Sequence, residues 1–310
     1  MPEFALPPTV IPVDCHYTGR GKAACFLIVE DGRAAFVDNN TSKALPYLIA
    51  ALEANNLTTQ DVEYAIVTHV HLDHAGGTAA LLERCPRAAV LAHPKAARHL
   101  VDPSRLAAGA RSVYGEDFDT LYGEIRGVPE DRVRVVEDEE VLRWGSRRLR
   151  FFHTLGHASH HVCIHDDKSN GVFTGDSFGL ALNWMVRPGP PFAVATTAPP
   201  DFDPEEARKS ARRIVGTGAD YAYLPHFGVH QNLERHAEML ERSIGQMEAI
   251  VPAAAAQELE GAALQRFCQQ RVRAAMEEQL AWCGVDDPEA DLAWLGEDIA
   301  INAMGLAHCA

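Results

Sequence analysis

Four side chains of types that commonly bind metals fall within six consecutive positions of the sequence. They are His69, His71, Asp73 and His74. The apolar, β-prone residues 64–68 precede them, and residues 78–83 after them have a helical pattern. We therefore expect a loop that leaves the carboxyl end of a strand and enters a helix, where open α/β folds collect functional groups. Three histidines and an aspartate at this spacing predict a dinuclear metal site.

Composition limits the partners more than the fold. The 310 residues are 47% hydrophobic, which is enough to bury a sizeable core in one large domain or in one domain with an appendage. With 28 Lys and Arg against 43 Asp and Glu, the net charge is −15, which argues against broad binding of nucleic acid or anionic membranes. Seven cysteines without a CxxC pair predict free thiols. Neither a signal peptide nor a membrane-spanning run is recognisable, so we expect a soluble cytoplasmic protein.

Strand patterns run through the first 230 residues, with helical patterns at 43–56 and 203–216. Residues 24–29 and 34–37 flank a Glu-Asp-Gly-Arg turn signal and predict a β-hairpin. Its second strand ends at Asp38, which fits equally a residue that caps a turn and a carboxylate that steadies a ligand histidine. Further strands are expected at 88–92, 133–136, 148–153, 162–165, 172–175 and 221–224.

Two regions have a helical character. Residues 95–128 form a predicted insert with an aromatic and cationic surface, and Tyr114 there is a candidate for the substrate pocket. After residue 231 the strand signals end, and helices are expected at 232–250, 256–283 and 288–307, broken by Pro252 and by residues 284–288. We therefore predict a catalytic domain over 1–231 and a helical C-terminal region over 232–310, which covers the pocket or forms a homodimer contact.

Three further candidate ligands follow later strands. They are His157, Asp176 and His226. Imidazole and carboxylate suit zinc, and also iron or manganese. Two neighbouring ions need a shared anion, and Asp176, which follows a strand and two small residues, is well suited to bridge them. A hydroxide held by two cations is a nucleophile at neutral pH, and the same ions polarise a carbonyl or phosphoryl oxygen.

The order of these motifs over residues 10–230 resembles the metallo-β-lactamase superfamily. The motifs are His69-x-His71-x-Asp73-His74, Gly156-His157, Gly175-Asp176 and His226, together with the strand end at Asp38. The resemblance implies a fold of the α/β (α+β) class, a four-layer αββα sandwich of two mixed sheets with helices outside. It also implies that His69, His71 and His157 hold one metal. By the same resemblance Asp73, His74 and His226 hold the second, Asp176 bridges the two, and Asp38 supports a ligand.

Within this superfamily the sequence looks like the glyoxalase II branch and not like a true lactamase. An aspartate at the Asp176 position is typical of the other hydrolase branches, and His74-Ala-Gly-Gly77 with a helical C-terminal region looks like glyoxalase II, a thioesterase. Residues 177–185 do not match the glutathione-site segment of that family. His160 stands where many relatives have glycine. Both His160 and the following His161 could support a metal ligand or contact substrate, and they could equally be ordinary histidines at the start of a strand.

The expected activity is that of a dinuclear metal-dependent hydrolase acting on a small-molecule ester, thioester or lactone by a metal-bridged hydroxide, which Asp73 helps to position. Two divalent ions are expected, with zinc as the first choice. Trp184, Met185 and Phe192 are candidates for an apolar pocket wall, with buried core as the alternative. Two other activities stay open: a persulfide dioxygenase with one iron, and a phosphodiesterase acting on a small nucleotide. Neither a nucleic-acid nor a membrane partner is expected.

Overall fold

The computed structural model describes residues 7, 9–181, 190–199 and 202–310. The chain divides into two units that interleave along the sequence, the first with residues 1–153, 160–175 and 219–229, and the second with residues 154–159, 176–218 and 230–310. Among the described residues, no helix is both long and apolar enough to cross a bilayer. All seven cysteines are free thiols, as predicted. The predicted domain boundary at residue 231 stays a prediction.

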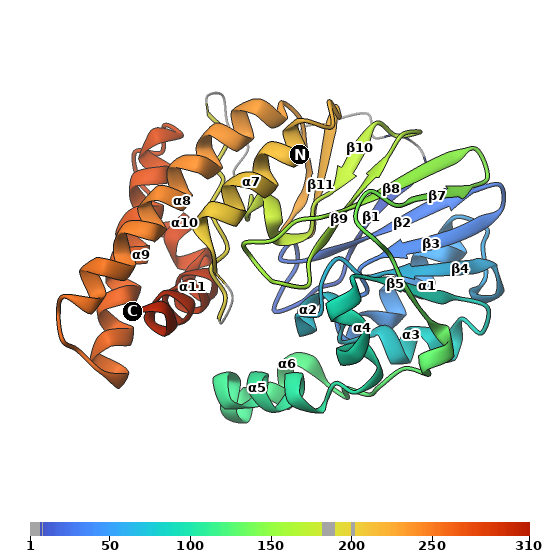
Figure 1. Ribbon diagram of the computed structural model, residues 1–310, viewed down its shortest axis with the longest axis horizontal. Helices are drawn as coiled ribbons and strands as arrows, with labels where there is room; N and C mark the ends of the chain where they lie inside the picture. Colours follow the sequence, from blue (N-terminus) through green and yellow to red (C-terminus); the bar gives the residue numbers. More distant parts are fainter. Residues whose placement is uncertain (1–6, 8, 182–189, 200–201) are drawn as a thin grey trace. The chain divides into compact units, whose positions relative to one another are not determined.

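Two six-stranded sheets provide the framework of the first unit (Figure 1). One sheet has the order β1 (Val10–Asp14), β2 (Ala24–Glu30), β3 (Arg33–Val37), β4 (Val62–Ile66), β5 (Ala89–Ala92) and β6 (Val133–Val135). The other has the order β12 (Gly228–His230), β11 (Tyr221–Leu224), β10 (Gly171–Phe173), β9 (Val162–Asp166), β8 (Arg147–His153) and β7 (Val141–Trp144). Strands β3 to β6 run parallel, so the residues that follow β3 and β4 meet at one edge of the sheet.

The continuous apolar run of β2 follows from burial of both of its faces. Because side chains alternate along a strand, Phe26 and Ile28 enter the core between the two sheets, while Cys25 and Leu27 enter a core on the other face. That outer core also contains Leu48 and Leu52 of α1 (Leu45–Ala54) and side chains of α3 (Thr78–Arg84). The first sheet therefore packs against the second sheet on one side and against α1 and α3 on the other.

The insert predicted at residues 95–128 is helical. It contains α4 (Pro94–Val101), α5 (Ser104–Tyr114) and α6 (Phe118–Tyr122). A short helix that the sequence did not indicate, α2 (Leu72–Ala75), stands between β4 and α3. The four clustered ligand candidates are therefore divided between a loop, with His69 and His71, and the helix α2, with Asp73 and His74.

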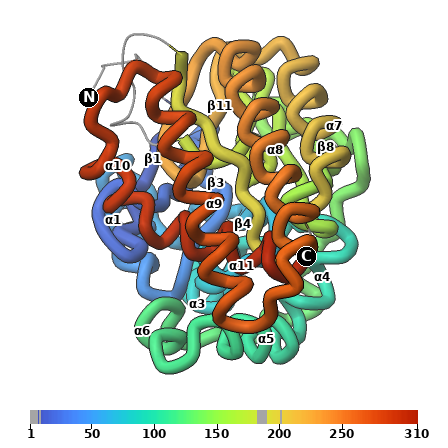
Figure 2. Tube along the Cα trace, turned by 90° about the vertical axis from the view of Figure 1, so that its left-hand side faces the viewer, coloured from blue at the N-terminus to red at the C-terminus, as the bar shows by residue number. Residues whose placement is uncertain are grey.

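The second unit is mostly helical. It contains α7 (Pro204–Val215), α8 (Leu233–Ala255), α9 (Gly261–Trp282), α10 (Glu289–Trp294) and α11 (Gly296–Cys309). Helices α8, α9 and α11 lie alongside one another (Figure 2). The two sheets, their helices and this helical C-terminal region confirm the predicted fold class.

Two predicted helix boundaries were wrong. Helix α8 continues through Pro252 to Ala255, because a proline in the last turns removes only its own N–H from the hydrogen-bond ladder. The helix expected at 288–307 is two helices, α10 and α11, that meet at Leu295.

Candidate metal centre

The strand end at Asp38 holds the turn that carries Asp73 and His74. The backbone N–H groups of Asn39 and Asn40 both donate to the carbonyl oxygen of His74, at 2.9 and 3.1 Å. The Asn40 side chain donates to the carbonyl of Asp73 at 2.7 Å. Gly77 allows this close approach, because a Cβ there would lie 2.7 Å from the carbonyl oxygen of Thr41. The loop after β3 therefore fixes the position of α2.

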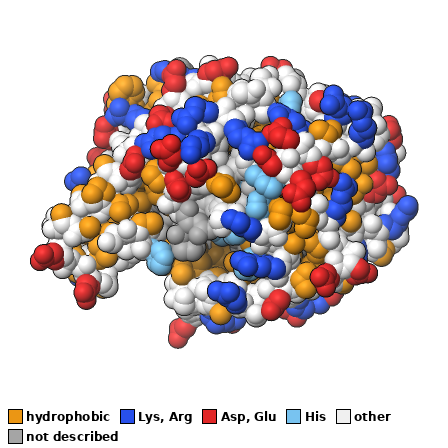
Figure 3. Space-filling model, in the orientation of Figure 1, with side chains coloured by type: hydrophobic (Ala, Val, Ile, Leu, Met, Phe, Trp, Pro, Cys, Tyr) orange, Lys and Arg blue, Asp and Glu red, His pale blue; other side chains and the backbone are white. Residues whose placement is uncertain are grey.

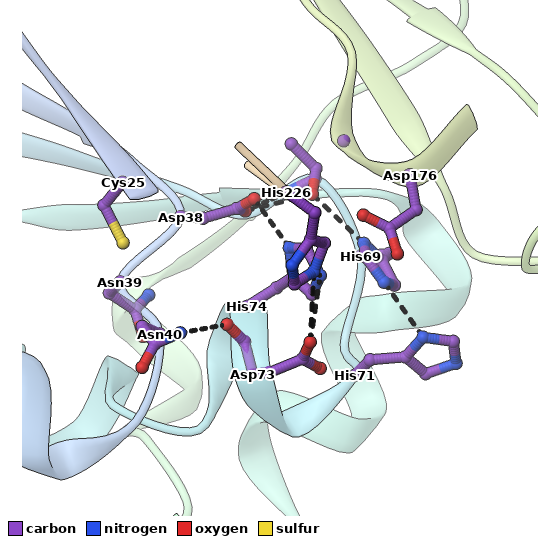
Figure 4. A network of polar contacts seen from close by, with 12 residues as sticks. Cys25, Asp38, Asn39, Asn40, His69, His71, Asp73, His74, Asp176 and His226 are labelled. Atoms are coloured by element: carbon purple, nitrogen blue, oxygen red, sulfur yellow. Dashed lines mark hydrogen bonds and ion pairs between the residues drawn. The ribbon is translucent and has the colours of Figure 1, made fainter. Parts of the chain in front are cut away.

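Asp38 is buried and accepts hydrogen bonds from two side chains of residues 68–74, the segment with the candidate metal ligands. Its carboxylate lies 3.0 Å from Nδ1 of His74 and 2.9 Å from Oγ1 of Thr68, and it also accepts from the Thr68 backbone N–H at 2.8 Å (Figure 4). Because a carboxylate only accepts, it places the His74 proton on Nδ1 and leaves a lone pair on Nε2. The contact is the one expected of a carboxylate that orients a ligand histidine.

Thr68 connects Asp38 to His69 by hydrogen bonds and so orients His69 as well. A hydroxyl has one proton, and Thr68 donates it to Asp38. Its oxygen, 3.1 Å from Nδ1 of His69, must then accept from that nitrogen, so His69 also has its lone pair on Nε2. The role of Thr68 was missed from the sequence, although its place directly before His69 was the available signal.

Asp73, His74 and His226 bring three possible ligand atoms together within the first unit. Oδ2 of Asp73 lies 3.2 Å from Nε2 of His226 and 3.5 Å from Nε2 of His74. The Lys22 carbonyl lies 3.1 Å from Nδ1 of His226 and so places that proton on Nδ1. The two Nε2 lone pairs then face each other across 3.2 Å, an arrangement that repels unless a cation or a proton lies between them. The donor set fits a divalent cation.

The negative charge of Asp73 also suits the binding of a divalent cation. Burial alone would raise the Asp73 pKa. When no cation is bound, a proton between the two imidazoles gives them positive charge, so the attraction of His74 and a hydrogen bond from His226 outweigh burial and hold the Asp73 pKa well below the usual range. Asp73 is therefore a carboxylate at neutral pH, available as an anionic ligand.

His69 and His71 form a second convergence in the first unit. Nε2 of His69 lies 3.0 Å from Nδ1 of His71, and His69 is fully buried. His161 stacks on His69 with ring centroids 4.9 Å apart, and His160 lies 5.8 Å from His71. The sequence left both histidines open; the structure places them around the predicted ligands and not on a distant surface.

Gly175 makes room for His161. Its φ is +46°, and a Cβ on it would lie 2.3 Å from Nε2 of His161. The small residue before Asp176 is therefore required both by the backbone conformation and by the histidine packed against it.

The second unit holds the two remaining predicted ligands, His157 and Asp176, side by side. Nε2 of His157 lies 3.5 Å from the Asp176 carboxylate, and both side chains are buried. Thr196 contacts both residues, with its Oγ1 2.9 Å from Nδ1 of His157 and donating to the Asp176 carbonyl at 3.0 Å. Thr196 lies in no motif, and no pattern in the sequence predicted its role.

The predicted pocket residues have different surroundings. Tyr114 is half-buried in an aromatic cluster of the insert, against Tyr122. Phe192 is buried in the second unit. Trp184 and Met185 lie outside the described residues.

Comparison with known proteins extends these observations. The family model described as the metallo-beta-lactamase superfamily matches residues 18–226. The metallo-beta-lactamase fold-containing protein ST1585 of Sulfurisphaera tokodaii is 31% identical over 157 residues, which are 50% of this chain and 56% of that protein. The crystal structure of ST1585 from Sulfolobus tokodaii superposes with a TM-score of 0.66 at 21% identity and covers 96% of this chain and 97% of its own. That structure is described as an archaeal metallo-beta-lactamase superfamily protein.

Two relatives have names that specify an activity. The acyl-coenzyme A thioesterase MBLAC2 of Bos taurus is 28% identical over 140 residues, 39% of this chain and 44% of that protein. The hydroxyacylglutathione hydrolase of Pelagibacter ubique is 25% identical over 152 residues, 49% of each chain. The chain thus spans about half the length of the curated relatives that it matches.

Proposed function

The chain belongs to the metallo-beta-lactamase superfamily, and we propose that it is a metal-dependent hydrolase that cleaves a small-molecule ester, thioester or lactone. One observation carries the proposal: Asp73, His74 and His226 converge with both histidine protons held on Nδ1 by fixed acceptors. Such a set is built to receive a cation. The names of the thioesterase and hydroxyacylglutathione hydrolase relatives support hydrolysis of a thioester in particular.

The residues divide the proposed work as follows. Asp73, His74 and His226 would hold one divalent cation, and His69 and His71 would contribute to a second. By the resemblance of the motif order, His157 and Asp176 would complete the donor set, and Asp176 would be the anionic ligand shared by the two cations. When bound, such cations polarise an acyl carbonyl and lower the pKa of water. Zinc suits these nitrogen and oxygen donors, as do iron and manganese.

Asp38 and Thr68 have a positioning role in this proposal. Asp38 accepts from His74 directly and from His69 through Thr68, so one buried carboxylate fixes the tautomer of two ligand histidines. Partners of this kind raise the basicity of the ligand and hold the ring orientation. Asp73 then offers a permanently charged oxygen beside the two imidazoles.

The test is a turnover panel on one preparation of the protein. Thioesters, esters, lactones and phosphodiesters are assayed on the protein as isolated, after chelation, and after zinc, iron or manganese is restored. We expect hydrolysis of at least one acyl substrate, loss of that activity on chelation and recovery with a divalent metal. Oxygen uptake on a persulfide, or cleavage of phosphodiesters alone, would contradict the proposal.

A further inference from the structure

Helix α5 has an apolar face that the rest of the first unit covers only in part. None of its eleven residues is fully buried. Leu106, Ala107, Ala110 and Tyr114 recur at helical spacing, and all four are half-buried against a small cluster of Leu72, Phe118 and Tyr122. A helix of this length in a folded unit usually buries such a stripe fully, whereas here part of each of these side chains stays exposed to solvent.

The cluster under α5 is mostly aromatic and includes Leu72, which lies among the candidate metal ligands of residues 69–74. The Tyr122 ring lies 5.3 Å from the rings of both Tyr114 and Phe118 and 6.2 Å from Tyr17. Burial, and after it the Asp73 carboxylate, raise the pKa of Tyr122, so its hydroxyl keeps its proton. Leu72, which packs in the same cluster, directly precedes Asp73. The cluster against which α5 packs therefore includes the residue directly before a proposed metal ligand.

The flanks of the same face are positively charged. Residues 94–112 contain four Lys and Arg and one Asp, a balance of +3 in a chain of net charge −15. Arg111 is held by two hydrogen bonds to Asp119. Lys95, Arg98 and Arg105 are exposed, and no carboxylate pairs with them among the residues that the structure describes. Figure 3 shows basic side chains exposed over α4 and α5. This rim complements an anionic group.

We propose that the half-buried face of α5 binds the apolar acyl chain of the substrate, and that Lys95, Arg98 and Arg105 attract a negatively charged leaving group. The inference rests on the proposed hydrolase function and narrows it to esters or thioesters of aliphatic acids with anionic alcohols or thiols. This one occupant is favoured by the partly exposed apolar stripe, by the presence of Leu72 in its cluster directly before Asp73, and by three cations without a carboxylate partner in the described part of the chain.

Linear carboxylates from acetate to dodecanoate test the face without any need for turnover. They share one head group, so the dependence of the dissociation constant on chain length reports the chain alone. Binding is measured by calorimetry on wild-type protein and on A107E and A110E, which place a charge on the half-buried face. A108E places the same charge on the neighbouring, exposed position of α5 and is the matched control. The exposed position of A108E, and the absence of fully buried residues in α5, predict that all three variants fold.

In wild-type protein and A108E, we expect affinity to rise about twofold to fourfold for each added methylene over the middle of the series. In A107E and A110E this rise should be lost, while acetate binds as before. Affinity that does not depend on chain length in the wild type, or the same dependence in all variants, would overturn the inference. So would a face covered by a second copy, seen as a dimer that A107E dissociates without any change in chain dependence.

Failure of the inference and failure of the proposed function are distinguishable. Turnover of acyl substrates without any dependence on chain length would support the proposed hydrolase activity and contradict the proposed acyl-binding face of α5. Binding that depends on acyl-chain length, in a protein that hydrolyses no ester, thioester or lactone, would support the acyl-binding face and contradict the proposed hydrolase activity.

Discussion

At the residue scale, the buried side chain of Asp38 determines which nitrogen of two histidines carries the proton. It has a left-handed φ of +57°, and its carboxylate accepts from Thr68 and His74. The consequence is a defined tautomer on both His69 and His74, with the lone pair on Nε2, the atom that would bind a cation. A carboxylate in this position acts on metal binding without touching the metal.

Replacing Asp38 with Asn tests this role. The amide keeps the shape but loses the charge, and it offers only one acceptor oxygen to Thr68 and His74. We expect zinc affinity to fall about 10- to 100-fold, measured by competition with a chelator of known affinity. Asp31→Asn, in the exposed β2–β3 turn, is the control and should bind zinc like the wild type. Equal affinity in both variants would remove Asp38 from the account.

The candidate metal ligands could be predicted from the sequence, but some residues that hydrogen-bond to them could not. The spacing of His69, His71, Asp73 and His74 is visible in a single stretch, because the ligands share one loop and helix. Thr196 is different: it contacts His157 from 39 positions away, and a single threonine outside any motif gives no signal. Hydrogen bonds between distant segments depend on packing that a local pattern does not contain.

At the scale of elements, α2 and its turn depend on a close approach of backbones. Gly77 meets the carbonyl oxygens of Thr41 and Asn39 at distances that leave no space for a Cβ. Glycine at position 77 is therefore a requirement of the close backbone approach.

Two alanine substitutions separate this packing effect from helix propensity. Gly77→Ala should lower the free energy of unfolding by about 1–3 kcal/mol, because the new methyl group overpacks against backbone. Gly109→Ala, in the exposed part of α5 with open space around its Cα, should raise it by about 0.5–1 kcal/mol. Urea denaturation of both variants measures the difference. A stabilised Gly77→Ala variant would contradict the close approach.

A buried ionic network connects strands of the two sheets. Glu30 of β2 accepts from Arg147 of β8 at 3.0 Å and from Lys168 at 2.7 Å, and Arg147 also pairs with Asp166 of β9. Burial alone would raise the Glu30 pKa, but hydrogen bonds from Lys168 and Ser146 lower it to about 2. The sequence did not indicate this network, whose members lie up to 138 positions apart.

This lowered pKa predicts a pH dependence of stability. A carboxyl group with a depressed pKa in the folded state stabilises the protein above its ordinary pKa and loses that contribution as pH falls. The stability difference between the wild type and Glu30→Gln should therefore be constant at neutral pH and shrink by up to about 3 kcal/mol between pH 4.5 and 2. Urea denaturation of both proteins across this range measures it. A difference that does not change with pH would contradict the assignment.

At the scale of the whole molecule, the sequence was sufficient for the fold class and for the order of the motifs. The continuous apolar run of β2 and the helical patterns after residue 231 follow from burial, which a sequence records directly. The two interleaved units were not foreseen, because contacts and not chain order define them. The absence of nucleic-acid partners and a homodimer through the C-terminal helices stay predictions.

The net charge of the whole chain has the opposite sign to the charge of one segment, residues 94–112. The chain carries −15, yet residues 94–112 carry +3. A small anionic substrate would therefore be repelled by most of the surface and attracted to the flanks of α5. The overall charge and the local charge together favour a small anion over a polyanion.

The central claim is that the histidine and aspartate set holds two divalent metal ions. Its most direct test is the metal-to-protein ratio of the purified wild type, determined by elemental analysis next to that of His226→Ala. The account predicts two equivalents of divalent metal in the wild type and the loss of one in the variant, because His226 is assigned to one ion only. A wild type that binds at most one equivalent, or a variant with unchanged metal content, would contradict it.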